Sequence, residues 1–260
     1  MLRRLLSAIG VYKVYRRWLR MQIGSKEKPQ HIGVILDGNR RWASSRSMIP
    51  WKGHREGAEK VKKFLDWCID IGIKTVTLYV FSTENFQRPR EEVDEIMQLA
   101  EENLEELLSS DVIHKNRVCI KAIGRTGLLP QRIQQLIQKV EEATDEYDGF
   151  YLNLALAYGG RAEIVDATRK LALKVKAGEI APGDIDEEVF EENLYTAYLP
   201  QPDPDLIIRT SGESRLSGFL LWQSAYSELF FVDVYWPDFR EIDFERAIRS
   251  FQQRRRRYGK

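Results

Sequence analysis

Cysteine and histidine are both scarce in this chain: its 260 residues include two cysteines and three histidines. Cys68 and Cys119 stand alone within apolar runs and lack the spacing of zinc ligands. We therefore expect buried thiols in a reducing compartment, and neither a disulfide framework nor a zinc site. No stretch approaches the roughly 18 consecutive apolar residues of a membrane-spanning helix. These absences leave a domain that folds around a hydrophobic core.

The charge is distributed unevenly, although the formal net charge is only +1. Residues 1–30 carry a net charge of +7 and residues 254–260 a further +5, which leaves −11 on residues 31–253. An acidic body with two basic ends does not indicate a nucleic-acid-binding protein. The basic ends suit an anionic lipid surface or diphosphates, or they are simply solvated tails.

The first 25 residues read as a basic amphipathic segment. Leucine and isoleucine recur at helical spacing from Leu2 to Leu19, with basic residues between them. Lys13, Arg16 and Arg17 fall where a signal peptide would need its apolar region. The pattern predicts a helix that lies on a membrane surface, or one that packs on another protein. We divide the chain into this segment, residues 1–25, and one domain, residues 26–260.

The rest of the chain alternates short apolar runs with longer amphipathic ones, which predicts an α/β fold with a mostly parallel central sheet and helices around it. A hydrophobic content of 43% supports one core, and no linker divides it. The predicted strands are 32–36, 75–81, 118–123, 151–155, 206–209 and 229–234. The predicted helices are 54–70, 91–109, 130–146, 160–177, 187–198 and 243–256.

Polar clusters that contain glycine or arginine follow four of these strands. They span residues 37–42, 82–89, 158–161 and 209–217. The carboxyl ends of parallel strands meet at one edge of a sheet, where ligands of such folds gather. We therefore expect the four clusters to form one site.

Two of the clusters have the chemistry of a diphosphate site. In the first, Asp37 precedes a glycine and two arginines, and a carboxylate beside bound phosphate needs a bridging cation such as Mg²⁺. Arg209 and Arg215 bracket serine hydroxyls in the other, which suits several phosphate oxygens. A plain turn at Asp37, or a surface loop at 209–217, is the simpler alternative. His54 lies among glycine and basic residues and is a phosphate contact or a structural histidine.

At this point the residues resemble a known family. Residues 31–43 (HIGVILDGNRRWA) look like the first signature of the cis-prenyltransferases, the undecaprenyl and dehydrodolichyl diphosphate synthases. Residues 53–58 (GHREGA), 81–89 (FSTENFQRP) and 153–161 (NLALAYGGR) are similar to the next three, and 209–213 (RTSGE), continued by FLLWQ and YSE up to Glu228, to the last. Five linked motifs in order, over residues 31–239, form a very specific signal.

The resemblance implies a fold of six mainly parallel strands with a hydrophobic tunnel, and a mouth that holds two diphosphates. It implies a Mg²⁺-dependent enzyme that adds isopentenyl diphosphate to an allylic diphosphate primer with Z geometry. Farnesyl and geranylgeranyl diphosphate are the primers we expect. The family also implies a homodimer. The expected reduced thiols fit the cytoplasm, and the basic N-terminal segment suggests a peripheral position on the inner face of the membrane. A catalytic domain of residues 26–260 follows.

The resemblance also assigns roles residue by residue. Asp37 is expected to bind Mg²⁺ and to help expel the primer's diphosphate, and Glu228 to complete the metal site or a dimer contact. Asn85 is the second catalytic residue, although the group that accepts the departing proton is open between Asn85, Ser82 and the released diphosphate. The expected substrate contacts are Gly38, Asn39, Arg40, Arg41, Trp42 and His54 for the primer, Ser82, Phe86 and Arg88 on the loop between the sites, and Arg209, Arg215 and Ser217 for isopentenyl diphosphate.

Some positions depart from the bacterial pattern, notably Pro50, Arg40, Phe86 and Gly218, and these bear on primer preference more than on the reaction. Arg257 belongs to a terminal R-x-G element that reaches into the partner's site in family dimers; the alternative is a frayed basic tail.

Three other functions were weighed against this one. The trans-type prenyl synthases need DDxxD clusters, and this chain has none. A nucleotide-binding or phosphatase-like α/β protein would use similar loops, but no P-loop lysine motif or Rossmann glycine pattern occurs. A non-catalytic accessory subunit would be degenerate in its Asp and Arg motifs, whereas Asp37, Arg41, Arg209 and Arg215 are all present.

Overall fold

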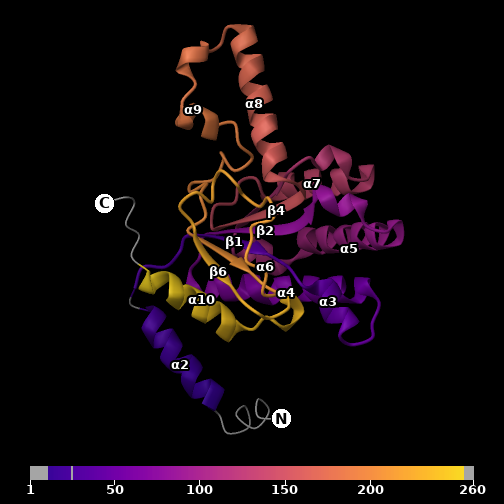
Figure 1. Cartoon of the computed structure of the whole chain (residues 1–260), viewed down its shortest axis with the longest axis vertical. Helices are drawn as coiled ribbons and strands as arrows, with labels where there is room; N and C mark the ends of the chain where they lie inside the picture. The colour runs from indigo at the N-terminus through magenta and orange to yellow at the C-terminus, as the bar shows by residue number, and fades with distance from the viewer. Residues whose placement is uncertain (1–10, 25, 255–260) are drawn as a thin grey trace.

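A computed structural model describes residues 11–24 and 26–254, with the side chains of residues 11–13 left aside. Six strands form one sheet in the order β3-β4-β2-β1-β5-β6, and every neighbouring pair is parallel (Figure 1). The strands are β1 (His31–Ile35), β2 (Thr75–Ser82), β3 (Val118–Ile123), β4 (Phe150–Tyr158), β5 (Leu206–Arg209) and β6 (Glu228–Phe231). The predicted α/β fold with a parallel six-stranded sheet is therefore confirmed, and the sheet is wholly parallel.

The helices account for most of the remaining chain. They are α2 (Val11–Gly24), α3 (Asn39–Ser44), α4 (Pro50–Ile71), α5 (Arg90–Ser109), α6 (Asp111–Lys115), α7 (Gln131–Thr144), α8 (Gly160–Ala177), α9 (Glu187–Glu191) and α10 (Glu241–Gln253). Four single 3₁₀ turns join them: η1 (Thr83–Gln87), η2 (Thr126–Leu128), η3 (Pro182–Asp184) and η4 (Trp236–Asp238).

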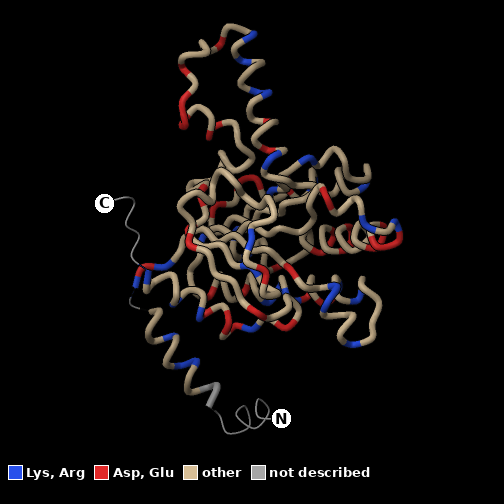
Figure 2. Tube along the Cα trace, viewed as in Figure 1, with Lys and Arg blue, Asp and Glu red and all other residues tan. Residues whose placement is uncertain are grey.

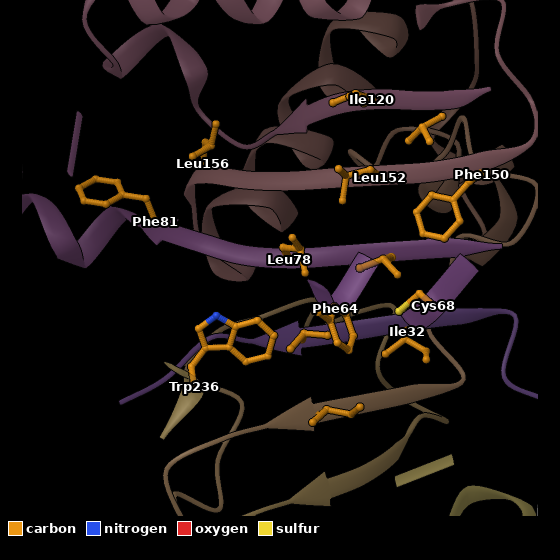
Figure 3. Packing of buried hydrophobic residues seen from close by; sticks show 14 of the residues in the cluster. Ile32, Phe64, Cys68, Leu78, Phe81, Ile120, Phe150, Leu152, Leu156 and Trp236 are labelled. Atoms are coloured by element: carbon orange, nitrogen blue, oxygen red, sulfur yellow. The ribbon is translucent and has the colours of Figure 1, made fainter. Parts of the chain in front are cut away.

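Alternate residues of the strands enter two hydrophobic clusters, one on each face of the sheet. Ile32 and Val34 point into the larger cluster with Phe64 and Cys68 of α4 (Figure 3). Ile35 points into the smaller cluster, which contains Phe219. These strands are buried on both faces, which is why they read as continuous apolar runs in the sequence.

A long limb of α8 and the return chain through α9 projects beyond the body (Figure 1). The predicted helix 187–198 is wrong in its second half, because α9 ends at Glu191. Beyond it, the backbone N–H of Tyr195 donates to the buried Glu163 carboxylate of α8 at 2.9 Å. This contact takes the N–H away from the helical carbonyl four residues earlier.

The amphipathic helix α2 packs against α10 of its own chain. Leu19 and Ile23 are buried, and Arg16 and Arg20 form ion pairs with Glu245, whose side chain is fully buried. Part of the apolar face that the sequence predicted for a membrane is therefore covered inside the molecule. No helix within the described ranges is both long and apolar enough to cross a bilayer.

Candidate active site

The backbone of Asp37 is fixed at the carboxyl end of β1. Its N–H donates to Thr210 Oγ1 at 3.0 Å, and that hydroxyl donates to the Asp37 carbonyl at 2.7 Å. The backbone N–H of Trp236 donates to the same carbonyl at 3.0 Å. Thr210 directly follows β5, so the hydroxyl ties together two strand ends. This is the edge where the strand order reverses, which is the usual ligand position in parallel sheets.

Gly38 turns the chain from β1 into α3. Its φ of 102° lies in the left-handed region, and a Cβ there would approach Tyr235 Cδ1 to 2.7 Å. Any side chain at residue 38 would therefore be strained and would meet Tyr235, so the turn keeps this course only with glycine.

The Asp37 carboxylate is held by two arginines. Arg209 Nη2 donates to Oδ2 at 2.7 Å, and Arg41 Nη2 to Oδ1 at 3.3 Å. Burial opposes ionisation, but the hydrogen bond and charge of Arg209, with Ser211 and Arg41, outweigh it and hold the pKa of Asp37 below its usual value. The carboxylate is ionised at neutral pH and remains partly exposed.

Arg209 is the buried cation of this edge. Its side chain is 5% exposed. Nη1 donates to Ser217 Oγ at 2.8 Å and to the Arg215 carbonyl, so it organises the loop that follows β5. Its Nε is buried and has no hydrogen-bond partner among the described residues. Arg215 is 62% exposed and pairs with Glu213, which also binds Arg41 Nη1 at 3.0 Å. The sequence-predicted arginines and Ser217 thus do come together.

A second group of basic side chains lies beside the first. Arg40, His54 and Arg88 come from α3, α4 and the loop before α5, and all three contact the carboxylate of Glu92. Burial, with the charges of Arg88 and Arg40, lowers the pKa of His54 against the opposing effect of its hydrogen bond to Glu92. Asp37, Gly38, Asn39, Arg40, Arg41, His54 and Arg88 line a cavity of about 420 Å³.

Ser82 and Asn85 lie at the turn η1 that follows β2. Asn85 Oδ1 accepts from the Ser82 backbone N–H at 3.1 Å, which completes a capping box around the turn. Both line a larger cavity, together with Arg209 and Ser217.

Two predicted substrate contacts have other neighbours in the free protein, and their roles stay predictions. Phe86 packs edge-on against Phe81 with ring centroids 4.8 Å apart. The Arg46 guanidinium stacks on Trp42, with Arg46 Cζ 4.2 Å from the centroid of the Trp42 ring. Neither lines either of the two cavities.

The larger cavity has a volume of about 790 Å³ and continues from the polar edge into the apolar core. Asp37 and Arg209 line its polar end. Leu78, Leu152 and Leu156 contribute the sheet side, and apolar residues of α4 and α5 the opposite side. A polar mouth that opens into an apolar channel fits a molecule with an anionic head and a hydrocarbon tail.

Glu228 does not lie at this edge. Leu206 pairs with Glu228 and Arg209 with Phe231 in the parallel register, so Glu228 begins β6 at the amino end of the sheet, opposite Asp37. Its carboxylate pairs with Arg254. In one copy of the chain Asp37 and Glu228 therefore do not meet at a common metal, and the role of Glu228 stays a prediction. Arg257 lies outside the described residues.

Comparison with known proteins identifies the family. The model of the family described as "Putative undecaprenyl diphosphate synthase" matches residues 35–259. The chain is 52% identical over 257 residues to a Methanocaldococcus jannaschii protein named tritrans,polycis-undecaprenyl-diphosphate synthase (geranylgeranyl-diphosphate specific), which covers 99% of this chain and 92% of that one. A Methanopyrus kandleri protein of the same name is 53% identical over 250 residues, covering 96% and 92%. The chain belongs to the cis-prenyltransferase family.

Solved structures of this family share the fold. The crystal structure of lavandulyl diphosphate synthase from Lavandula x intermedia in complex with dimethylallyl diphosphate has a TM-score of 0.85 and 39% identity, covering 90% of this chain and 99% of that one. A probable undecaprenyl diphosphate synthase from Campylobacter jejuni has a TM-score of 0.73 and 33% identity over 90% and 100%. The named relatives are synthases of the cis type, so the chain is a prenyl-transferring enzyme and not a non-catalytic accessory subunit.

Sequence reasoning missed Glu92 and Glu213, the two carboxylates that hold the arginines of this cis-prenyltransferase. Glu92 has one sequence signal, its position four residues after Arg88 at the start of a helix, which is the spacing of an ion pair. Glu213 belongs to the RTSGE motif, but nothing in the sequence indicates which arginines it contacts.

Proposed function

We propose that the enzyme condenses isopentenyl diphosphate with geranylgeranyl diphosphate and then extends the product by further Z-configured units. The observation that carries this is the 790 Å³ cavity, which joins the arginines at the carboxyl ends of β1 and β5 to an apolar channel between the sheet and α4 and α5. The names of the Methanocaldococcus jannaschii and Methanopyrus kandleri relatives, both described as geranylgeranyl-diphosphate specific, support geranylgeranyl diphosphate as the primer over farnesyl diphosphate.

Two diphosphates need two sets of cations, and the site offers them on either side of Asp37. We assign the primer's diphosphate to the smaller cavity, with Asn39, Arg40 and Arg41. We assign the diphosphate of isopentenyl diphosphate to Arg209 and Ser217, together with the exposed Arg215. The primer's first carbon would face the double bond of isopentenyl diphosphate across the Asp37 carboxylate, with both hydrocarbon tails toward the channel.

Negative charge grows on the primer's diphosphate as its bond to the allylic carbon breaks. Arg41 and the other primer-side cations stabilise that charge because they are already oriented in the free enzyme. The apolar channel keeps water from the allylic cation. Ser82 and Asn85 line the cavity between the two anion sites and are placed to receive or relay the proton that leaves the condensed unit, unless the released diphosphate takes it.

The donors around Asp37 fit Mg²⁺ only if substrate completes its coordination. Among residues 11–24 and 26–254, no three His, Cys, Asp or Glu side chains gather as a preformed metal site. Mg²⁺ commonly binds through one or two carboxylates with substrate phosphates and water. Asp37 would hold the ion against a diphosphate, and the ion would supply charge stabilisation to the leaving group.

A homodimer is part of the proposal. Figure 2 shows Lys and Arg along α8 and Asp and Glu along the return through α9, so two limbs can pair in opposite directions. Val165 and Leu173 are exposed apolar residues of α8. We also assign Arg257 to the partner's site, where a further cation would help to neutralise two diphosphates. Analytical ultracentrifugation of the full chain tests the assembly: a dimer is expected, and a monomer at micromolar concentration would contradict it.

Peripheral contact with the inner face of the membrane is assigned to α2. Val14 and Met21 are exposed, while Leu19 and Ile23 face α10, so the helix has an outer apolar face as well as a buried one. Basic residues flank that outer face, which suits anionic lipid.

Radiolabelled isopentenyl diphosphate tests the function directly. Purified protein is incubated with geranyl, farnesyl or geranylgeranyl diphosphate, with Mg²⁺ or with EDTA, and the products are sized by chromatography. We expect Mg²⁺-dependent incorporation, with geranylgeranyl diphosphate the best primer. Incorporation that is unaffected by EDTA would contradict the metal assignment. An absence of incorporation with every primer would contradict the function.

A further inference from the structure

Glu92 is a buried carboxylate that contacts two arginines and a histidine from three separate segments. It lies in the first turn of α5 and is 3% exposed. Oε1 lies 3.2 Å from His54 Nε2 and 3.2 Å from Arg88 Nη1, and Oε2 lies 3.4 Å from Arg40 Nε. Because α3, α4 and the loop before α5 each contribute one of these contacts, the Glu92 carboxylate joins the three segments to α5.

Glu92 itself does not line either cavity, whereas its three partners do line the smaller one or both. It therefore stands behind the cations that face the proposed primer site. A group in this position acts on a ligand through its partners and not by touching it.

Arg40 and Arg88 repel each other, and their charges oppose protonation of His54. Burial lowers the pKa of Arg88 and of His54, and the charge of Arg40 lowers both further, while Glu92 acts in the opposite direction. A carboxylate behind them makes it possible to keep these groups close together in the absence of an anion. Arg40 is the partner with the most freedom, because half of its side chain is exposed.

We propose that Glu92 is a positioning residue that holds Arg40, His54 and Arg88 in place for the diphosphate of the allylic primer. The inference rests on the proposed function for the identity of the diphosphate. It assigns Glu92 to one substrate, since no contact joins it to Arg209 or Ser217 in the described structure.

The substitution Glu92→Gln separates positioning from net charge, because the two effects have opposite signs. Removing a negative charge from behind the site makes it more positive, and Coulomb attraction alone would then tighten diphosphate binding. If Glu92 positions the cations, the released Arg40 and Arg88 weaken binding instead. Glu91→Gln is the matched control, since it removes the same charge from the same helical turn at an exposed side chain.

Calorimetric titration with geranylgeranyl diphosphate alone, in Mg²⁺ buffer, measures primer binding without turnover. We expect Glu92→Gln to raise the primer Kd about tenfold, Glu92→Asp to lie between it and wild type, and Glu91→Gln to stay within about twofold. The KM of isopentenyl diphosphate should change less than twofold in all three variants. Adding Arg40→Gln to Glu92→Gln should then raise the primer Kd only slightly further, because both substitutions remove the same contact.

Unchanged or tighter primer binding in Glu92→Gln, with a normal melting temperature, would overturn the proposal. Equal losses for primer and isopentenyl diphosphate would also overturn it, since they would indicate a general structural role. Should Glu92→Gln fail to fold, Glu92→Asp and the control carry the same comparison. A wild-type protein that binds the primer but incorporates no isopentenyl diphosphate would refute the proposed function. The comparison of primer Kd values between the variants would remain valid in that case, because it does not need turnover.

Discussion

His31, the first residue of the first motif, predicts how stability depends on pH. Its ring is fully buried, and Nδ1 lies 3.1 Å from the Gln201 carbonyl, which can only accept, so Nδ1 carries the proton. Nε2 is then the acceptor for the Thr77 hydroxyl at 2.8 Å. Thr77 in turn accepts from Asn153 Nδ2 at 2.8 Å. A protonated ring would leave the Thr77 hydroxyl without its acceptor, so this network fits only the neutral imidazole.

Burial lowers the pKa of His31 from 6.5 to about 4, against the opposing effects of the Gln201 carbonyl and Asp205. The unfolded chain binds the proton more tightly, so the contribution to stability is complete above pH 6.5 and is lost as the pH falls toward 4. A difference of about 2.5 units corresponds to roughly 3 kcal/mol in total. About 2 kcal/mol of this should be lost between pH 7.5 and pH 5.0.

Urea unfolding at pH 7.5 and pH 5.0 measures this loss in wild type and in His31→Gln. Gln cannot titrate, so the variant should be less stable at pH 7.5 but should lose about 2 kcal/mol less than wild type on acidification. If wild type and His31→Gln lost the same free energy between the two pH values, the assignment of a buried neutral His31 would be refuted.

Two further predictions use the contrast between buried and exposed partners. Arg209→Ala should lower the free energy of unfolding by about 3 kcal/mol and raise the KM of isopentenyl diphosphate. Arg215 is exposed, so Arg215→Ala should raise the same KM while the free energy of unfolding stays within about 0.5 kcal/mol of wild type. A rise in the primer's KM instead would mean that the two anion sites are exchanged. Replacing both Val14 and Met21 with Asp should abolish sedimentation with anionic liposomes and leave urea unfolding unchanged. Leu19→Ala should instead lower the free energy of unfolding by about 2–5 kcal/mol, because Leu19 packs on α10. Liposome binding that survives the two Asp substitutions would rule out membrane contact through the outer face of α2.

The sheet could be predicted because its strands are apolar on both faces and are separated by helical periodicity. The polar clusters after those strands could be assigned to one edge, since parallel strands place their carboxyl ends together. Asp37, Arg209 and Ser217 meet there as expected. What could not be predicted is which carboxylate holds which arginine, because Glu92 becomes a buried hub only when α4 packs beside α5.

The same limit applies to α2. Its amphipathic pattern was correctly identified, but the helix that it packs against, α10, lies more than 200 residues away in the chain. Glu241 and Glu245 of α10 bind Arg16 and Arg20 of α2. The end of α9 was missed for a related reason, since the acceptor that draws Tyr195 out of a helix is a glutamate of α8. Local periodicity contains no information on contacts between distant segments.

The groups around Asp37 are expected to accelerate departure of the primer's diphosphate. Rapid quenching of one turnover, with primer and Mg²⁺ bound before radiolabelled isopentenyl diphosphate is added, measures that step without product release. For Asp37→Asn we expect the first condensation to slow on the order of 10²–10⁴-fold, while the Kd of each substrate changes less than about tenfold. A first condensation at nearly the wild-type rate, in saturating Mg²⁺ and with a normal circular dichroism spectrum, would contradict the account.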